Sequence, residues 1–222
     1  MNSSLHRFLL SALLCSFVPL LGACDADDTE IDSAGDDTVA TTVTDEKESV
    51  PSVPGDAIGV ITTPMGKPLP SDDAIDFTLV SHTAPQFSWQ TGAGEKGSLA
   101  DYRGKVVMLN FWATWCGPCL RELPDIVQLR NELSPKGFEV LGISVSEQPP
   151  DGLTLENYLG LFAKQEGVTY PILVADEALT AMYGGIQGIP TTFIVDRDGR
   201  VVRKFVGAMP GAEFRSAVEA VL

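Results

Sequence analysis

The sequence predicts an α/β domain in which a central mixed β-sheet carries helices on both faces. Two observations support this fold class. Apolar runs typical of strands buried on both faces alternate with helical segments over residues 105–195. A β-hairpin and an amphipathic helix follow, and this order of elements favours a sheet covered on both sides. The 146 residues from 77 to 222 are enough to bury most of their surface as one domain.

Five segments are predicted to be strands. Three are nearly continuous apolar runs, at residues 105–111, 137–145 and 191–195. A short fourth strand is expected at 171–175. The fifth, at 200–206, follows a turn rich in Asp and Gly and closes a hairpin with 191–195.

Three helices are predicted between and after these strands. The first two cover residues 118–133 and 154–166, the second with Leu155, Leu159 and Phe162 on one face. Near the C-terminal end, apolar residues spaced i, i+3, i+4, i+7 and i+8 form one stripe that faces a core: Phe214, Ala217, Val218, Val221 and Leu222.

Acidic residues outnumber basic residues by two to one, and most of the excess lies in one segment. The chain has 30 Asp and Glu against 15 Lys and Arg, a formal net charge of -15. Residues 25–76 hold 14 acidic side chains against only Lys47 and Lys67, whereas residues 77–222 carry a net charge of -4. So large an acidic excess excludes electrostatic binding to nucleic acid phosphates or to anionic lipid headgroups.

The first 24 residues have the pattern of a secretory signal. Residues 1–7 are polar and positively charged, and 8–21 form an apolar run of 14 residues. This run is shorter than the about 20 residues that a membrane-spanning helix needs. Residues 21–24, Leu-Gly-Ala-Cys, then resemble the lipobox of bacterial lipoprotein signal peptides. The resemblance implies that residues 1–23 are removed and that Cys24 is lipidated; the alternative is an ordinary cleaved signal in which Cys24 has no role.

Residues 24–76 are predicted to be an acidic disordered tether. The part from 25 to about 53 lacks periodic apolar positions and is almost free of aromatic residues, so it cannot bury enough surface to fold. Residues 58–70 mix apolar side chains with prolines and glycines and receive no assigned structure. In some bacteria an Asp after the acylated Cys, as at Asp25, keeps a lipoprotein at the inner membrane. The expected location is therefore the periplasmic face of the cytoplasmic membrane, with the outer membrane as the alternative.

Two of the four cysteines remain in the expected mature domain, Cys116 and Cys119. They belong to the sequence Trp-Cys-Gly-Pro-Cys, which follows a buried strand and begins a helix. A spacing of i, i+3 in the first helical turn brings the two sulfurs within disulfide reach, and the helix N-terminus favours a thiolate at Cys116. Pro118 suits a first turn because its missing N–H is not needed there, and Gly117 leaves the approach to Cys116 uncrowded.

Other roles fit the cysteine pair less well than a redox-active dithiol does. A structural disulfide across so short a loop would constrain the unfolded chain little. A closed zinc site needs four ligands, and His82 is the one further soft ligand in the expected mature sequence. A copper carrier would be expected to present a His near the thiols, and none is evident in the sequence around Cys116 and Cys119. A peroxidatic cysteine usually lies in the sequence Pro-x-x-x-Thr-x-x-Cys, which is not found around Cys116. The sequence therefore predicts neither a metal nor an organic cofactor.

Residues 110–119, Asn-Phe-Trp-Ala-Thr-Trp-Cys-Gly-Pro-Cys, resemble the active-site segment of the thioredoxin superfamily, and most of all that of the TlpA/ResA-like membrane-anchored thiol-disulfide oxidoreductases. Pro124 matches the proline at which this family kinks its active-site helix. Residues 188–193, Gly-Ile-Pro-Thr-Thr-Phe, resemble the loop with the family's cis-proline, which makes Pro190 the residue that faces the dithiol. The resemblance covers about residues 83–222 and implies a thioredoxin-like three-layer fold.

The resemblance also implies chemical roles. Cys116 attacks a substrate disulfide, and Cys119 resolves the mixed disulfide. Glu122 matches an acidic residue in the family sequence Cys-x-x-Glu-x-Pro and is predicted to accept the proton of Cys119, with a pKa raised by partial burial. Asn110 stands where thioredoxins carry a buried Asp and cannot accept a proton. The alternative for Glu122 is an exposed glutamate of an ordinary helix.

Substrate-binding residues are expected at the rim of the dithiol and on the facing loop: Trp115, Gly117, Pro118, Ile189 and Pro190. Trp112 is expected beneath the site. A cis bond before Pro190 would turn the backbone of Ile189 toward an extended substrate peptide, to which it would offer strand-like hydrogen bonds.

Together these features predict an extracytoplasmic thiol-disulfide oxidoreductase. The sequence Gly117-Pro118 resembles reducing thioredoxins more than periplasmic oxidants, so a reductase is favoured. Its expected partners are a membrane electron donor and disulfide-containing extracytoplasmic proteins such as apocytochromes. One alternative is a thioredoxin-like module that binds clients without turnover, and another is a peroxide-reducing redoxin of the AhpC/TSA-like kind.

Overall fold

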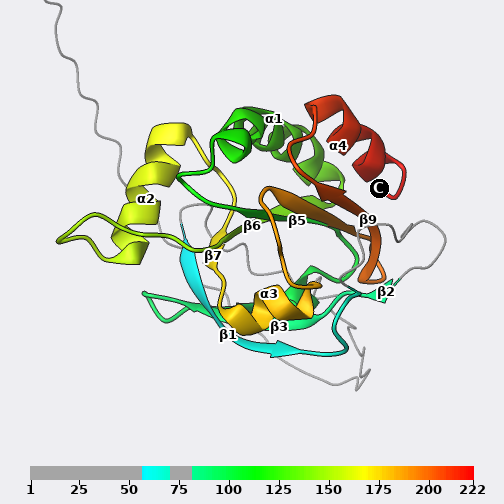
Figure 1. Cartoon of the computed structure of the whole chain (residues 1–222). Coiled ribbons are helices and arrows are strands. Elements are labelled where there is room, and N and C mark those ends of the chain that lie inside the picture. Colours follow the sequence, from blue (N-terminus) through cyan, green and yellow to red (C-terminus); the bar gives the residue numbers. More distant parts are fainter. Residues whose placement is uncertain (1–56, 71–81) are drawn as a thin grey trace, which may run out of the picture. The chain divides into compact units, whose positions relative to one another are not determined.

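The computed structural model describes residues 57–70 and 82–222 (Figure 1). The predicted signal segment 1–23, the predicted lipidation site Cys24 and residues 25–56 and 71–76 of the predicted tether lie outside these ranges. Within the described ranges, no helix has the length and apolar character needed to cross a membrane.

Nine strands of the described residues form one mixed sheet in the order β2-β9-β8-β5-β6-β7-β1-β3-β4. β5 lies between β6, to which it is parallel, and β8, to which it is antiparallel. The strands are β1 (Ile58–Met65), β2 (His82–Thr83), β3 (Gln86–Thr91), β4 (Lys96–Ser98), β5 (Val106–Trp112), β6 (Phe138–Ser144), β7 (Ile172–Val174), β8 (Thr191–Val195) and β9 (Arg200–Val206).

The helices of the described residues cover both faces of this sheet: α1 (Gly117–Leu133), α2 (Leu155–Glu166), α3 (Glu177–Met182) and α4 (Gly211–Glu219). Successive side chains of β5 point to opposite faces. Val106 and Met108 pack with α1, α2 and α4, whereas Val107 and Leu109 pack with α3. Figure 1 shows α1 and α4 on one side of the sheet and α3 on the other. The predicted α/β architecture with helices on both faces is confirmed.

The predicted strands at 105–206 and the first two predicted helices lie within one residue of the observed elements at each end. The strands at 191–195 and 200–206 are reproduced as β8 and β9, and the helix at 154–166 is α2 preceded by its N-cap residue Thr154. The side chains of the predicted helical stripes are buried in, or packed against, one core cluster: Leu155, Leu159, Phe162, Phe214, Ala217, Val218, Val221 and Leu222. The C-terminal stripe is helical only as far as Glu219, where α4 ends, so Val221 and Leu222 pack from beyond the helix.

The tether predicted for residues 24–76 is wrong over β1, because these residues belong to the sheet. β1 pairs in parallel with β7 and antiparallel with β3, and Ile61 is buried. Gly59 is required there, since a Cβ atom at this position would stand 2.6 Å from Trp89 Cδ1 and 2.9 Å from Leu173 Cδ2. The prolines and glycines around β1 weaken its local strand pattern, and the strand exists because β7 and β3 satisfy its backbone groups.

Four further elements have no counterpart in the prediction: β2, β3, β4 and α3. β3 did carry a readable signal, since Phe87, Trp89 and Thr91 alternate with polar residues and are buried. α3 has only six residues, and its N-cap is Asp176, whose carboxylate accepts a hydrogen bond from the Leu179 N–H at 2.7 Å. So short a helix leaves too few periodic positions to be recognised.

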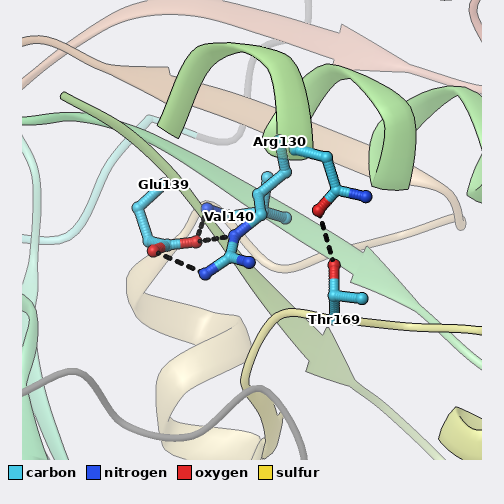
Figure 2. Close-up of polar contacts among 5 residues, drawn as sticks. Arg130, Glu139, Val140 and Thr169 are labelled. Carbon is cyan, nitrogen blue, oxygen red and sulfur yellow. Dashed lines mark hydrogen bonds and ion pairs between the residues drawn. The ribbon is translucent and has the colours of Figure 1, made fainter. Parts of the chain in front are cut away.

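The helix that follows the dithiol, α1, is fixed to the sheet by an ion pair (Figure 2). Arg130 Nε and Nη2 donate to the two carboxylate oxygens of Glu139 on β6, at 2.9 and 3.2 Å. Glu139 Oε1 also accepts from the Val140 N–H at 2.9 Å, and Thr169 donates to Asn131 at 3.1 Å. Two parallel hydrogen bonds between half-buried partners define one geometry, so the C-terminal half of α1 is held in register with β6.

Candidate active site

The two cysteines lie where β5 gives way to α1. Cys116 is the N-cap residue of α1, with φ -85° and ψ 98°, and Cys119 is in the first turn. Their sulfurs are joined by a disulfide of 2.10 Å, with the Cα atoms 5.3 Å apart, so the structure is the oxidised form. The prediction that the i, i+3 spacing brings the sulfurs within disulfide reach is confirmed.

The start of α1 favours negative charge on Cys116. The backbone N–H of Cys119 donates to Cys116 Sγ at 3.3 Å, as it would to the side chain of any N-cap residue. After reduction, the same N–H and the positive end of the helix dipole would stabilise a thiolate at Cys116. Gly117 and Pro118 are exposed beside it, and a Cβ atom on Gly117 would meet nothing closer than Arg121 Nη1 at 3.9 Å. Gly117 therefore adds no bulk beside Cys116, whose own residue is 5% exposed in this oxidised form.

The predicted facing loop is confirmed in its geometry. The bond Ile189–Pro190 is cis, and Cys116 Sγ lies 3.7 Å from the carbonyl oxygen of Ile189. The loop is held on both sides of this bond, because the Thr191 hydroxyl donates to the Gly188 carbonyl and the Gly207 N–H donates to the Pro190 carbonyl, each at 2.8 Å. A backbone fixed this close to the sulfur can pair with an extended peptide whose disulfide reaches Cys116.

Glu122 is buried, with 3% of its surface exposed, so the alternative of an exposed helix glutamate is wrong. Its Oε1 accepts from Asn110 Nδ2 at 3.1 Å, and its Oε2 accepts from the Met209 N–H at 3.2 Å. Burial raises the pKa of Glu122 to about 7, against the smaller lowering effect of these two hydrogen bonds. A carboxyl that titrates near neutral pH can both take up and release a proton under working conditions.

Asn110 does more than the sequence suggested. Its amide also donates to Thr192 Oγ1 at 2.9 Å, so one side chain of β5 connects Glu122 to β8. Asn110 and Thr192 are direct partners in the register of the antiparallel pair. No sequence signal pointed to Thr192 as a partner of Asn110 or to Met209 as a partner of Glu122, because strand pairing and the turn after β9 bring these residues together.

A cavity of about 470 Å³ opens beside the dithiol. Trp115 and Ile189 line it together with Val145, Ser146 and the loop residues 186–188. Trp115 is 60% exposed and directly precedes Cys116, whereas Trp112 is fully buried, as predicted for a rim residue and a residue beneath the site. The structure thus brings the predicted Trp115 and Ile189 to one cavity, with Cys116 Sγ at the Ile189 carbonyl and Glu122 one turn after Cys119 on α1. The predicted lipidation site Cys24 lies outside the described residues.

Comparisons with known proteins agree with this arrangement. A family model described as Redoxin matches residues 79–222. The thiol-disulfide oxidoreductase ResA of Geobacillus thermodenitrificans is 37% identical over 144 residues, which cover 64% of this chain and 78% of that protein. The thioredoxin-like protein YneN of Bacillus subtilis is 36% identical over 136 residues, or 61% of this chain and 76% of that protein.

A solved structure shares the fold. The thiol:disulfide interchange protein of the thioredoxin family from Chlorobium tepidum TLS superposes with a TM-score of 0.56 at 36% identity, over 64% of this chain and 96% of that chain. The family model spans more than half of the residues and includes the dithiol, the facing loop and Glu122. The chain therefore belongs to the redoxin family and has the thioredoxin-like fold.

Proposed function

We propose that this protein is a thiol-disulfide oxidoreductase that reduces disulfide bonds of extracytoplasmic proteins, apocytochromes among them. The observation that carries the proposal is the Cys116–Cys119 pair at the first turn of α1, with Cys116 Sγ 3.7 Å from the Ile189 carbonyl oxygen. The buried carboxyl of Glu122 lies one turn after Cys119 on the same helix. A sulfur beside a backbone that can pair with substrate, and a carboxyl that can exchange a proton, are what disulfide exchange requires.

The reaction has two exchange steps. The thiolate of Cys116 attacks one sulfur of the substrate disulfide; a mixed disulfide forms, and the other substrate sulfur leaves as a thiolate. Cys119 then loses its proton and attacks Cys116 Sγ, so that the Cys116–Cys119 bond forms and the second substrate thiolate leaves. Two electrons pass from the dithiol to the substrate, and the observed disulfide is the product state. A membrane electron donor then returns two electrons to the pair.

Glu122 is the proposed proton acceptor for Cys119. The two residues are three positions apart on α1 and therefore lie on the same face of the helix. With a pKa of about 7, Glu122 is ionised in about half of the molecules at neutral pH and can take the proton as Cys119 attacks. The hydrogen bonds from Asn110 and from the Met209 N–H keep its carboxylate oriented during this transfer.

The direction of the reaction is the part of the proposal that a potential measurement tests. The pair Gly117-Pro118 supports a reductase, so the reduction potential is expected near the about -270 mV of thioredoxin. Equilibration of the purified domain with thioredoxin, followed by alkylation and separation of the reduced and oxidised forms, gives this value. A potential near the about -120 mV of the periplasmic oxidant DsbA would contradict the proposed direction.

The extracytoplasmic anchor is proposed from the signal-like residues 1–24. Cells that express the full chain are expected to incorporate radiolabelled palmitate into the wild-type protein and to retain it in the membrane fraction. Cys24→Ser is expected to lose both the label and the membrane association, because its sulfur is the acceptor for the lipid. Cys15→Ser, which changes the other N-terminal cysteine inside the apolar run, is the control and should be labelled like the wild type. Equal labelling of Cys24→Ser and wild type would refute the anchor.

A thioredoxin-like module that binds clients without turnover is the main competing function. Reduction of insulin by the dithiol form, followed by precipitation of the freed chains, distinguishes the two, since a binding module would leave insulin soluble. Both cysteines are present and close enough to form a disulfide, which supports turnover.

A further inference from the structure

Glu147 lies in the loop between β6 and α2, and its carboxylate reaches back to the segment that precedes Cys116. Glu147 Oε1 accepts hydrogen bonds from the Thr114 backbone N–H and from the Ser144 hydroxyl, each at 2.8 Å. Glu147 Oε2 accepts a third hydrogen bond from the Thr114 hydroxyl at 2.6 Å. One side chain thus ties the end of β6 to the turn between β5 and the dithiol.

The hydrogen-bond network has a defined direction. A carboxylate only accepts, so the single hydroxyl proton of Thr114 is directed at Glu147. Tyr158 of α2 lies 2.9 Å from Thr114 Oγ1, and its hydroxyl must therefore donate to Thr114. Every member of the network is paired, so that Thr114, itself buried, has one preferred orientation.

The residues next to Thr114 and Glu147 form a second link. The indole Nε1–H of Trp115 donates to the Ser146 carbonyl at 3.0 Å. Ser146 has a φ of 53°, a left-handed conformation that a residue other than glycine keeps only when its surroundings hold it. In this conformation the Ser146 carbonyl faces Trp115 while the side chain of Glu147 faces Thr114. Two consecutive residues of the loop thereby hold two consecutive residues of the chain just before Cys116.

We propose that Glu147 is a positioning residue that fixes Trp115 as one wall of the substrate cavity beside Cys116. Trp115 and Ser146 line the cavity together, and Ile189 lines it too. Trp115 is 60% exposed, and among the described residues its indole N–H donates to the Ser146 carbonyl, so the position of Trp115 depends on that loop being in place. Glu147 acts through Thr114 and Trp115 and does not touch the sulfurs, which makes it a determinant of protein substrate docking. The inference rests on the proposed function and deepens it.

The alternative is that Glu147 only stabilises the fold by satisfying the buried Thr114 N–H. The two roles predict different effects on protein and small-molecule substrates. If Trp115 is displaced, the reduction of a protein disulfide, which has to dock in the cavity, slows more than the reduction of a small disulfide, which has only to reach the sulfur of Cys116. Misplacement by about 1 Å can cost on the order of a hundredfold in rate, so a tenfold loss is a moderate expectation for a loosened wall.

The experiment compares pre-reduced wild type, Glu147→Gln and a control in single-turnover reactions with two disulfides. Insulin tests docking, and Ellman's reagent, a small aromatic disulfide, tests the reactivity of Cys116 alone. Glu139→Gln is the matched control, because Glu139 is also a half-buried glutamate that joins two elements, through Arg130, away from the cavity. Acrylamide quenching of tryptophan fluorescence adds a spectroscopic readout, since Trp115 is exposed while Trp89 and Trp112 are buried.

Glu147→Gln is expected to reduce insulin about tenfold more slowly than wild type does. Its rate with Ellman's reagent should stay within about threefold of the wild-type rate. Acrylamide should quench its tryptophan fluorescence more strongly than that of wild type. Glu139→Gln should match wild type in the ratio of the two rates. If Glu147→Gln does not fold, Thr114→Val, which keeps the volume and the backbone hydrogen bond, should show the same change of ratio to a smaller extent. An unchanged ratio in the variants overturns this inference alone. A wild type that reacts with Ellman's reagent but leaves insulin intact overturns the proposed function and this inference with it.

Discussion

Cys116→Ser is expected to abolish the reduction of insulin, with a loss of more than about a thousandfold in the single-turnover rate. Cys116 is the N-cap of α1, its sulfur accepts a hydrogen bond from the Cys119 N–H, and it lies 3.7 Å from the Ile189 carbonyl oxygen. It is therefore the proposed attacking sulfur. A serine hydroxyl cannot form the mixed disulfide that precedes electron transfer. The rate is measured by following insulin precipitation with pre-reduced protein and no other thiol present.

The complementary variant Cys119→Ala separates attack from resolution. It retains the attacking sulfur but lacks the group that releases the substrate, so mixed disulfides with client proteins should accumulate and resist washing in denaturant. The double variant Cys116→Ser with Cys119→Ala is the control and should trap nothing. Adducts that form equally well with the double variant would show that the exchange does not start at Cys116.

Glu122→Gln is expected to remove a pH dependence of stability from the oxidised protein. Burial raises the pKa of Glu122 to about 7, from 4.5 in the ordinary case. Below pH 4.5 the carboxyl is protonated in both the folded and the unfolded state. As the pH rises from 4.5 to 7, the unfolded state loses the proton while the folded state keeps it, so folding becomes less favourable. At about 1.4 kcal/mol per pKa unit, the total loss amounts to about 3 kcal/mol above pH 7.

Urea unfolding of wild type and Glu122→Gln, each oxidised, at several pH values between about 4 and 8 measures this difference. The stability of wild type relative to the variant should fall by about 3 kcal/mol across that range, and other titrating groups cancel in the comparison. Glu132→Gln is the matched control on the same helix, because Glu132 is exposed and should not reproduce the fall. Parallel stability curves for wild type and Glu122→Gln would contradict the raised pKa.

The same variant tests the catalytic role of Glu122. If Glu122 accepts the proton of Cys119, resolution of the mixed disulfide should slow by on the order of a hundredfold in Glu122→Gln, which is the usual contribution of a general base. Attack by Cys116 on Ellman's reagent should change little, since Cys116 is stabilised by the helix N-terminus. Unaltered resolution in the variant would leave Glu122 as a structural group only.

Local patterns were sufficient for the central sheet and for the dithiol. β5, β6 and β8 are apolar along nearly their whole length because both of their faces are covered, and α1 begins at the cysteine pair because a Pro in the first turn and an N-cap sulfur suit a helix start. These features are contained in fewer than ten consecutive residues each. The assignment of the facing loop around Pro190 depended on family resemblance, and the structure agrees with it.

Local patterns failed where a residue's role depends on a distant partner. β1 has a weak strand pattern and is a strand because β7 and β3 pair with it on either side. The burial and raised pKa of Glu122 were expected from the family resemblance and not from a local pattern, because they arise where β5, α1 and the turn before α4 meet. No role was predicted for Glu147, because the residues adjacent to it in the sequence do not show that its side chain reaches Thr114.

The sequence by itself determined the class of sheet and the redox-active pair, because periodicity and a three-residue spacing are properties of adjacent residues. Tertiary structure alone decided that β1 belongs to the sheet, which groups hold Glu122 and which loop holds Trp115. The physical reason is that burial, desolvation and hydrogen bonding between distant segments arise only when the chain is packed.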